Sequence, residues 1–351
     1  MKSLPTCSHR GPAVGIGYQC WSDSVPESVV PASQCMKCPL VTTQRKEKGL
    51  ILQCHLPPGD QLTLTAAVES LHRSYPGVYR TGIKTSAPEL WENNPHIVEL
   101  DKSEAKTIHM HYDLVNSSNQ HSVVFLEGYT LHLSQKLGIP LRLVVNRPYV
   151  YLSDEEKSWE NQVSEHFTNG RSIPFWMINA GIKTDYTAKA WPVESYQAVV
   201  DALRGIVQFV QIGSSGDEHP QLRGVINLVG QTSLREMCRL AYHSQGGVGP
   251  VTFLQHLCAA FEKPYICIAG GREPLPWITS YPKQTTLHTI GALDCCRDTA
   301  CWRSKVVPRS DKDKDLCQLP VLGLERPVAK CMAMIPPAEV CSIIARYNQA
   351  T

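Results

Sequence analysis

The feature that most constrains the fold is a repeated alternation of short apolar runs with segments of helical periodicity. In the first half, GLILQCHL is typical of a buried strand, PPGDQ interrupts it, and LTLTAAVESLHRSY carries apolar residues at helical spacing. Strands are also predicted at VYRTGIKT and KTIHMHYD, and helices at APELWEN and at SVVFLEGYTLHLSQKLG, which ends at Gly138. This alternation predicts a doubly wound α/β sheet.

The alternation starts again in the second half of the chain. Ser153 and Glu156 carry the signature of a capping box, so SDEEKSWENQVSEHF is predicted to be a helix that leads into this half. Strands are then predicted at PFWMINAG, IVQFVQIG, VINLVG and PYICIAGG, and helices at VESYQAVVDALRG, SLREMCRLAYHS, TFLQHLCAAF and PAEVCSIIARYNQA. We therefore predict two α/β domains, 48–168 and 169–351, with a ligand-binding cleft between them.

Composition excludes several classes of protein. Of the 351 residues, 42% are hydrophobic and 19% charged, and the formal net charge is +2, which gives no case for nucleic-acid binding. The apolar runs are shorter than the ~18 residues that span a bilayer, and the N-terminus lacks the apolar core of a secretory signal. We therefore expect a cytoplasmic protein with no membrane span, whose 14 cysteines are thiols or metal ligands. Four of them lie in strand-like or helix-like runs and are expected to be buried small side chains: Cys54, Cys238, Cys258 and Cys267.

A segment near the C-terminus, 294–332, has the spacing of a four-cysteine metal site. Cys296 (or its neighbour Cys295) and Cys301 could come from one turn, and Cys317 and Cys331 from longer loops around the same ion. The segment is rich in charge and proline, so a metal would supply its order. A site of four thiolates suits zinc as well as iron. We call 294–332 the cysteine lobe.

Residues 1–47 form a separate segment with four further cysteines, Cys7, Cys20, Cys35 and Cys38. Only one CxxC pair is present. Two interpretations stay open, a second small metal knuckle and an irregular lead-in.

Several loops after predicted strands carry candidate site residues. Asp60 could be a general base at the mouth of the cleft, or only a helix-capping or first-turn carboxylate. The segment Asn179–Pro192 could bind phosphate through Lys183 and Lys189, or be a solvated loop. The small residues of Gly246–Leu257 could let a helix N-terminus approach a ligand such as a pyrophosphate, with His256 just inside the helix, or His256 could be only a packed or surface residue. Ala269–Pro274 could be a strand-to-loop turn at the site, or only a surface turn with a salt bridge. No GxGxxG follows the first strand, which disfavours a nicotinamide-dependent dehydrogenase.

Taken in order, these motifs resemble glycosyltransferase family 9, the heptosyltransferases that use ADP-heptose. The motifs that carry the resemblance are PPGDQLTLTAAVESLHRSYPG, the K-x-W-P element at Lys189–Pro192, the G-x-T/S-x-L-R-E element at Gly230–Glu236, the helix start at Val251–Ala260, and the K-P strand from Lys263. Together they cover roughly 49–290.

The resemblance implies two facing Rossmann-like domains of the GT-B type, with the acceptor on the first and the nucleotide-sugar on the second. It implies an inverting transfer without a catalytic metal, in which ADP leaves and Asp60 is the base on the acceptor hydroxyl. It also implies that Lys189 contacts the phosphate or sugar of the donor. The nucleotide-sugar site would include Gly59, Gly181, Thr187, Lys189, Gly230, Thr232, Thr252 and His256.

Val251 departs from the family pattern, because the family has an aspartate there that holds hydroxyls of the donor sugar. Phe253 likewise replaces a family glycine. The donor sugar is therefore left open, and so is an alternative function as a catalytically weak sugar-nucleotide-binding or scaffold protein.

The cysteine lobe is similar to the iron-binding finger of the bacterial autotransporter heptosyltransferases. That similarity implies a structural iron at Cys296, Cys301, Cys317 and Cys331. The acceptor, a protein or a glycan, and the oligomeric state are left open.

Overall fold

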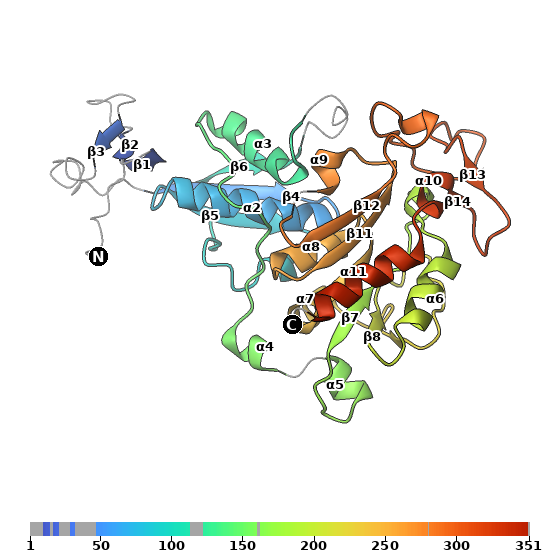
Figure 1. Ribbon diagram of the computed structural model, residues 1–351. Helices are drawn as coiled ribbons and strands as arrows, with labels where there is room; N and C mark the ends of the chain where they lie inside the picture. The colour runs from blue at the N-terminus through green and yellow to red at the C-terminus, as the bar shows by residue number, and fades with distance from the viewer. Residues whose placement is uncertain are drawn as a thin grey trace.

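A computed structural model describes residues 47–112, 122–159, 162–279 and 281–349, together with the backbone of three short N-terminal strands (Figure 1). These strands, β1 (Arg10–Val14), β2 (Gly17–Cys20) and β3 (Val29–Pro31), pair antiparallel. The predicted metal knuckle of Cys7, Cys20, Cys35 and Cys38 falls outside the residues whose side chains the structure describes.

The first α/β unit is built on a parallel three-stranded sheet. The strands β4 (Lys48–Cys54), β5 (Tyr79–Thr85) and β6 (Ala105–His109) lie in the order β5-β4-β6, with β4 buried at the centre. Two helices follow strands of this sheet, α2 (Pro58–Ser74) and α3 (Gly128–Leu137), and they pack on each other. The predicted strands and the helix end at Gly138 are confirmed, the latter by a left-handed φ of 65°. The helix predicted at APELWEN is only a single 3-10 turn, η2 (Pro88–Leu90).

The second unit has a six-stranded parallel sheet in the order β12-β11-β10-β7-β8-β9. Its strands are β7 (Phe175–Ile178), β8 (Gln208–Gln211), β9 (Ile226–Asn227), β10 (Gly246–Pro250), β11 (Tyr265–Gly270) and β12 (Gln284–His288). The chain order reverses between β7 and β10, which is the doubly wound order of a dinucleotide-binding fold and creates a crevice at the carboxyl ends of these two strands.

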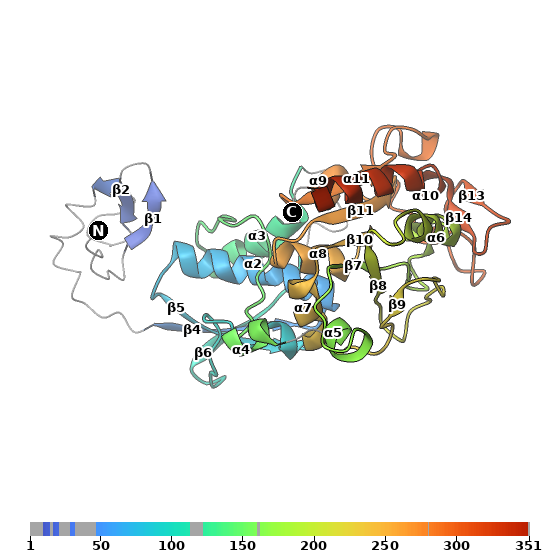
Figure 2. The same cartoon turned by 60° about the horizontal axis from the view of Figure 1, so that its bottom comes forward.

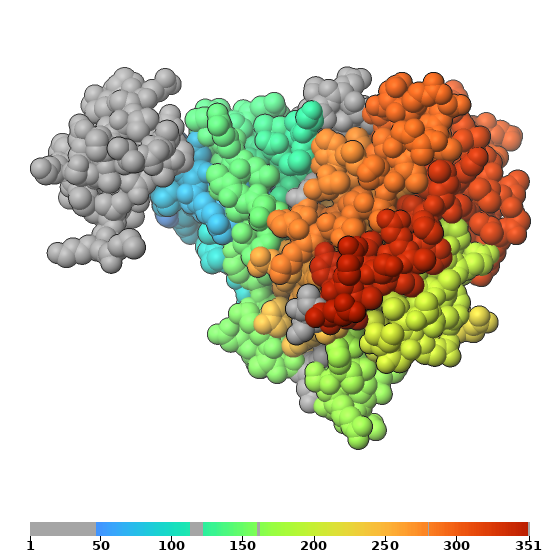
Figure 3. Space-filling view, viewed as in Figure 1, coloured from blue at the N-terminus to red at the C-terminus, as the bar shows by residue number. Residues whose placement is uncertain are grey.

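The helices of the second unit cover both faces of this sheet (Figure 1). They are α6 (Val193–Ala202), α7 (Leu234–His243), α8 (Phe253–Ala260), α9 (Leu275–Ile278), α10 (Lys330–Ala333) and α11 (Pro337–Gln349). Helix α11 (dark red in Figure 3) lies on the surface of the second unit, where it packs on α6. None of the described helices has the length and apolarity that crossing a bilayer requires.

Gly246–Pro250 form the buried strand β10, a strand that the sequence pattern did not predict. Its glycines let neighbouring groups approach closely. A Cβ on Gly246 would lie 2.8 Å from the carbonyl oxygen of Pro264, and one on Gly249 would lie 2.9 Å from that of Asn179. The small residues of this strand therefore allow the close packing of the sheet.

The two units share one hydrophobic core. Helix α2 of the first unit packs against α8 of the second, as Figures 1 and 2 both show, and apolar residues of the two sheets belong to the same buried cluster. The connection between the units contains α4 (Asp154–Ser158), whose predicted capping box between Ser153 and Glu156 is confirmed, and a separate helix α5 (Gln162–Phe167).

Arg235 of α7 fastens the second unit to the first and to the connection. Its guanidinium makes two hydrogen bonds of 2.6 Å to the carboxylate of Glu156 and donates to the carbonyl oxygens of Glu89 and Tyr151 at 3.0 and 2.8 Å. The side chains of Arg235 and Glu156 are only 12% and 9% exposed, so this bidentate pair is largely shielded from water.

Replacing Arg235 by Met is expected to lower the free energy of unfolding by about 3 kcal/mol, because it leaves the buried Glu156 carboxylate without its cation. Urea denaturation followed by tryptophan fluorescence measures the change. The matched control is Arg204→Met, which removes an exposed pair with Asp201 and should cost less than about 0.5 kcal/mol. Equal losses in the two variants would show that Arg235 does not join the units.

Candidate active site

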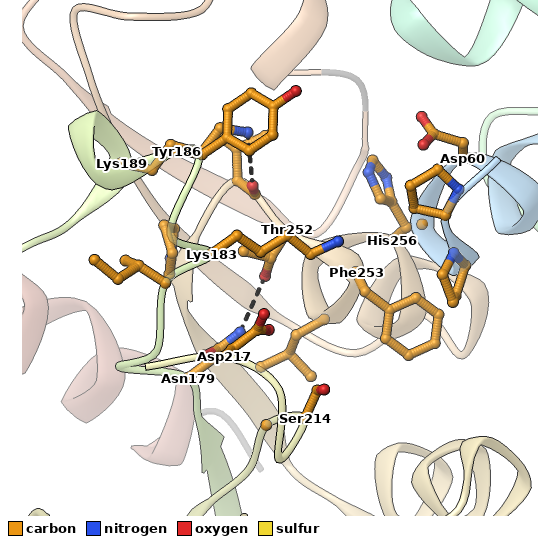
Figure 4. Close-up of a pocket in the computed structure, with 18 of the residues that line it drawn as sticks. Asp60, Asn179, Lys183, Tyr186, Lys189, Ser214, Asp217, Thr252, Phe253 and His256 are labelled. Carbon is orange, nitrogen blue, oxygen red and sulfur yellow. Dashed lines mark hydrogen bonds between the residues drawn. The ribbon is translucent and has the colours of Figure 1, made fainter. Parts of the chain in front are cut away.

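A cavity of about 680 Å³ lies between the two units, at the carboxyl ends of their strands. The start of α2 contributes Asp60 to its lining, and loops after β7, β8 and β10 contribute residues from the opposite side. Figure 4 shows Asp60 on one side of this cavity and Lys189 on the other. The volume is within the range of small-molecule sites, and the position is the one expected for a ligand in an open α/β fold.

Asp60 is the third residue of α2, and Pro57, not Asp60, is the capping residue of this helix. The carboxylate instead accepts a hydrogen bond of 2.6 Å from the hydroxyl of Tyr112. Burial raises the pKa of Asp60 above its usual value, and the Tyr112 hydrogen bond and the charges of Lys189 and Lys183 partly oppose this rise. Asp60 is therefore a shielded carboxylate in the cavity, available as a proton acceptor, and not a helix cap.

A buried ion network faces Asp60 across the cavity. The Nζ atom of Lys189 lies 2.7 Å from Oε1 of Glu273 and donates to the carbonyl oxygen of Val251 at 3.2 Å. Arg272 pairs with the same Glu273 carboxylate. Burial alone would raise the pKa of Glu273, but the charges of Lys189 and Arg272 outweigh it and lower this pKa. The network therefore holds two cations and one carboxylate, with a net positive charge.

Arg272 and Glu273 were expected in a charged turn, with a surface salt bridge as the simplest interpretation. They are in fact 5% and 3% exposed, and both line the cavity. Within the described residues, Oε2 of Glu273 has no hydrogen-bond partner. Sequence spacing cannot distinguish a surface pair from a buried one, because burial depends on the cysteine lobe that covers this turn: Arg272 donates to the carbonyl oxygen of Arg303 at 2.8 Å.

Helix α8 begins at the cavity with residues predicted to bind the donor. Thr252, its capping residue, lines the cavity and accepts a hydrogen bond from the side-chain amide of Asn179 at 3.4 Å. His256 also lines the cavity, and its Nδ1 atom lies 2.6 Å from the hydroxyl of Tyr281. Burial lowers the pKa of His256 to about 3, so its ring is neutral near pH 7 and offers hydrogen bonds but no charge.

Of the residues predicted to bind the nucleotide-sugar, the structure brings five to the cavity: Gly59, Lys189, Thr232, Thr252 and His256. The other three do not line it. Gly181 is packed against the ring of His219, with which a Cβ would collide. Thr187 accepts a hydrogen bond of 2.9 Å from the amide of Val306, and Gly230 adopts a left-handed φ of 69°. These three residues shape the loops beside the cavity.

Four aromatic side chains on the same cavity were not predicted: Tyr112, Phe125, Trp277 and Trp302. They come from four separate segments and follow no shared spacing. Only their placement in the fold brings them together, so no sequence signal marked them.

The cysteine lobe holds a second, enclosed cavity of about 10 Å³, lined by Cys295, Cys301, Cys317 and Cys331. Cys296 instead donates from its Sγ to the carbonyl oxygen of Thr289 at 3.5 Å. In the described part of the chain, no group of three or more His, Cys, Asp or Glu side chains has an arrangement that could hold a metal ion. The predicted metal lobe is thus not shown, although four thiols lie around one small space. The other four predicted thiols, Cys54, Cys238, Cys258 and Cys267, are buried as expected.

The parallel sheets, the doubly wound order and the cavity between two α/β units define a GT-B-like glycosyltransferase fold. Residues 93–301, more than half of the chain, match the family model described as glycosyltransferase family 9 (heptosyltransferase). The chain therefore belongs to glycosyltransferase family 9, a family of sugar-transferring enzymes. The sequence matches no curated protein.

Solved structures agree on the fold. A family 9 glycosyltransferase from Veillonella parvula is similar with a TM-score of 0.60 at 12% identity, covering 88% of this chain and 99% of that one. The ADP-heptose lps heptosyltransferase II of E. coli gives 0.55 at 15% identity, covering 86% and 99%. The iron-containing dodecameric glycosyltransferase TibC of enterotoxigenic E. coli gives 0.58 at 16% identity, covering 95% and 82%.

Proposed function

We propose that this enzyme transfers a sugar, with ADP-heptose as the donor, to the hydroxyl of an acceptor, with inversion and with Asp60 as the general base. The observation that carries the proposal is the placement of Asp60 in one cavity with Lys183, Lys189 and the N-terminus of α8. Residues 48–168 would then form the acceptor side of the enzyme and 169–351 the nucleotide-sugar side.

Asp60 has the properties that a base for this reaction needs. One carboxylate oxygen is held by Tyr112, which fixes the orientation of the group and leaves the other oxygen for the acceptor. The acceptor oxygen forms its bond to the anomeric carbon while the bond from this carbon to the phosphate oxygen breaks, and the acceptor proton moves to Asp60. Because burial raises the pKa of Asp60, the carboxylate is a better proton acceptor than an exposed aspartate.

The opposite side of the cavity is suited to the departing diphosphate. Lys183 extends across the cavity toward Thr252 (Figure 4), and Lys189 lies near the start of α8. The free backbone N–H groups of the first turn of α8 and the positive end of its dipole also favour an anion. Preorganised positive groups stabilise the negative charge that develops on ADP as the glycosidic bond breaks, so the transfer needs no catalytic metal.

The identity of the donor is supported by the structural relatives. The E. coli heptosyltransferase II is named for ADP-heptose, and TibC has been solved in complex with ADP-D-β-D-heptose, with a TM-score of 0.52 to this chain. Val251, which lines the cavity where the family has an aspartate, favours the second candidate, a sugar-nucleotide-binding protein with weak catalysis. The buried Glu273 carboxylate, however, lies beside Lys189, which also contacts the Val251 carbonyl. The cavity thus retains a carboxylate close to this position, and we favour the transferase.

Replacing Asp60 by Asn is expected to lower the rate of ADP release from ADP-heptose, with water or an added glycan as acceptor, by roughly 10²–10⁴-fold. Donor binding, measured by calorimetry, should be retained. The variant should be as stable as the wild type or more stable, because the raised pKa means that ionised Asp60 destabilises the folded state near pH 7.

The control is Asp185→Asn, an exposed carboxylate in the loop near Lys183 that does not line the cavity. It should leave turnover unchanged. Turnover that survives in Asp60→Asn would contradict the base assignment. Donor binding without any turnover in the wild type would instead favour the sugar-nucleotide-binding protein.

We also propose that the cysteine lobe binds a structural metal ion, iron or zinc, through Cys295, Cys301, Cys317 and Cys331. These four side chains line one enclosed cavity, and four thiolates are a ligand set that either metal accepts. TibC is described as iron-containing, which favours iron. Of the two candidates for the first ligand, Cys295 and Cys296, we propose Cys295, because it lines this cavity whereas the Cys296 thiol donates to the Thr289 carbonyl.

Elemental analysis of protein purified without added metal is expected to find about one iron or zinc ion per chain. Cys317→Ser should lose this metal and melt at a lower temperature, whereas Cys341→Ser, which changes a thiol in α11 outside the lobe, should retain it. A metal-free wild type with the same melting temperature as Cys317→Ser would refute the site.

A further inference from the structure

Four aromatic rings form a continuous wall on one side of the active-site cavity. Phe125 lies 4.7 Å from Trp277 and 5.2 Å from Tyr112, measured between ring centroids. Trp277 in turn lies 5.7 Å from Trp302. All four side chains line the cavity, and each is only partly buried. Each ring therefore exposes part of its surface to the cavity.

The rings of this wall are not coplanar. The planes of Trp277 and Trp302 are 84° apart, whereas Phe125 is tilted by only 31° from Trp277. We call this arrangement of Tyr112, Phe125, Trp277 and Trp302 the aromatic corner. A flat molecule can lie against one ring face and be stopped by the next, which fixes its orientation.

Trp302 is held in the corner at a conformational cost. Its φ of 55° lies in the left-handed region, which is rare for a bulky side chain. Its backbone amide donates to the carbonyl oxygen of Arg272 at 3.0 Å, and the guanidinium of Arg272 lies 5.1 Å from the Trp302 ring centroid. The cysteine lobe therefore brings this ring to the cavity and fixes it there.

The aromatic corner is joined to Asp60. The hydroxyl of Tyr112 donates to Oδ1 of Asp60 at 2.6 Å, and the Tyr112 ring lies 6.1 Å from that of Trp277. Other segments of the cavity lining belong to the doubly wound sheet, in the loop after β8 and at the start of α7 (Ile212, Gly213, Ser214, Gly216, Asp217, Thr232, Ser233, Leu234 and Met237). A molecule in the aromatic corner can thus present a hydroxyl group to Asp60 while the nucleotide occupies the loops of the sheet.

The cations of the cavity are engaged by other groups. Arg272 and Lys189 both bind Glu273, and Arg272 also donates to the carbonyl oxygen of Arg303. In the proposed complex Lys183 and Lys189 face the donor diphosphate, so the positive charge of the cavity serves the donor and not the acceptor. A sugar ring has an apolar C–H face that suits an aromatic surface and hydroxyl groups at its rim that suit the carboxylate, so a neutral ring fits both features.

We propose that the aromatic corner is the acceptor subsite of this enzyme and that it takes a neutral sugar ring, with one ring hydroxyl directed to Asp60. Tyr112 and Phe125 belong to the acceptor-side unit 48–168, and Trp277 and Trp302 complete the subsite from the second unit. The proposal rests on the proposed transferase function and adds the chemical class of its acceptor. Trp277 is the central residue, because it contacts Tyr112, Phe125 and Trp302.

The test is a titration of the full-length protein, saturated with ADP, with neutral methyl hexopyranosides and with a methyl hexuronide, followed by tryptophan fluorescence. The neutral glycosides should change the fluorescence saturably, and Trp277→Leu should weaken their binding on the order of 10-fold. The matched control is Trp159→Leu, which changes an exposed tryptophan outside the cavity and should leave the affinity unchanged. ADP affinity, measured in each variant, shows that the nucleotide side is intact.

The other outcomes of this titration would each overturn a different part of the proposal. Tighter binding of the hexuronide than of the neutral glycosides would overturn the neutral acceptor. Equal glycoside binding by the wild type and a Trp277→Leu variant that still binds ADP would overturn the aromatic corner as the subsite. Failure of all glycosides to bind, while Asp60-dependent ADP release from ADP-heptose persists, would overturn the subsite and leave the transferase function standing. If the wild type does not release ADP from ADP-heptose, the proposed transferase function itself is refuted.

Discussion

The walls of the active-site cavity depend on the ion pairs of the Glu273 carboxylate. It binds Lys189 from the loop after β7 and Arg272 from the loop after β11, and Arg272 in turn binds the cysteine lobe through Arg303. Three segments far apart in the sequence therefore meet at one buried group. Without this carboxylate, two cations would face each other in a site with little water, a situation that costs several kcal/mol.

The position of the two α/β units completes the cavity. Helix α2 packs on α8, so the helix start that carries Asp60 lies beside the helix start that carries Thr252. Arg235 holds the connection between the units in place from the other side. The carboxylate and the positively charged side therefore face each other across one space, as a displacement at an anomeric carbon requires.

The alternation of strands and helices was predictable because each element carries its own periodicity. Asp60 was proposed as the base from the family resemblance and from its place at the start of the helix that follows the first predicted strand. Other features depend on contacts that sequence spacing does not contain. Glu273 looked like one member of a surface pair until the cysteine lobe was seen to cover it, and Trp277 and Trp302 meet only in the folded chain. Strand β10 was missed, because glycines such as Gly246 allow close sheet packing but have no side chain that would give the segment the apolar pattern of a strand.

The pH dependence of kcat/KM for ADP release tests the central claim, that Asp60 is the base and Tyr112 tunes it, most directly. The base must be ionised, so the rate should fall as pH falls through the pKa of Asp60, which burial places above its usual value. Tyr112→Phe keeps the ring but removes the hydrogen bond that favours the ionised form, so the acid limb should move to higher pH. An acid limb at the same pH in both proteins would contradict the account.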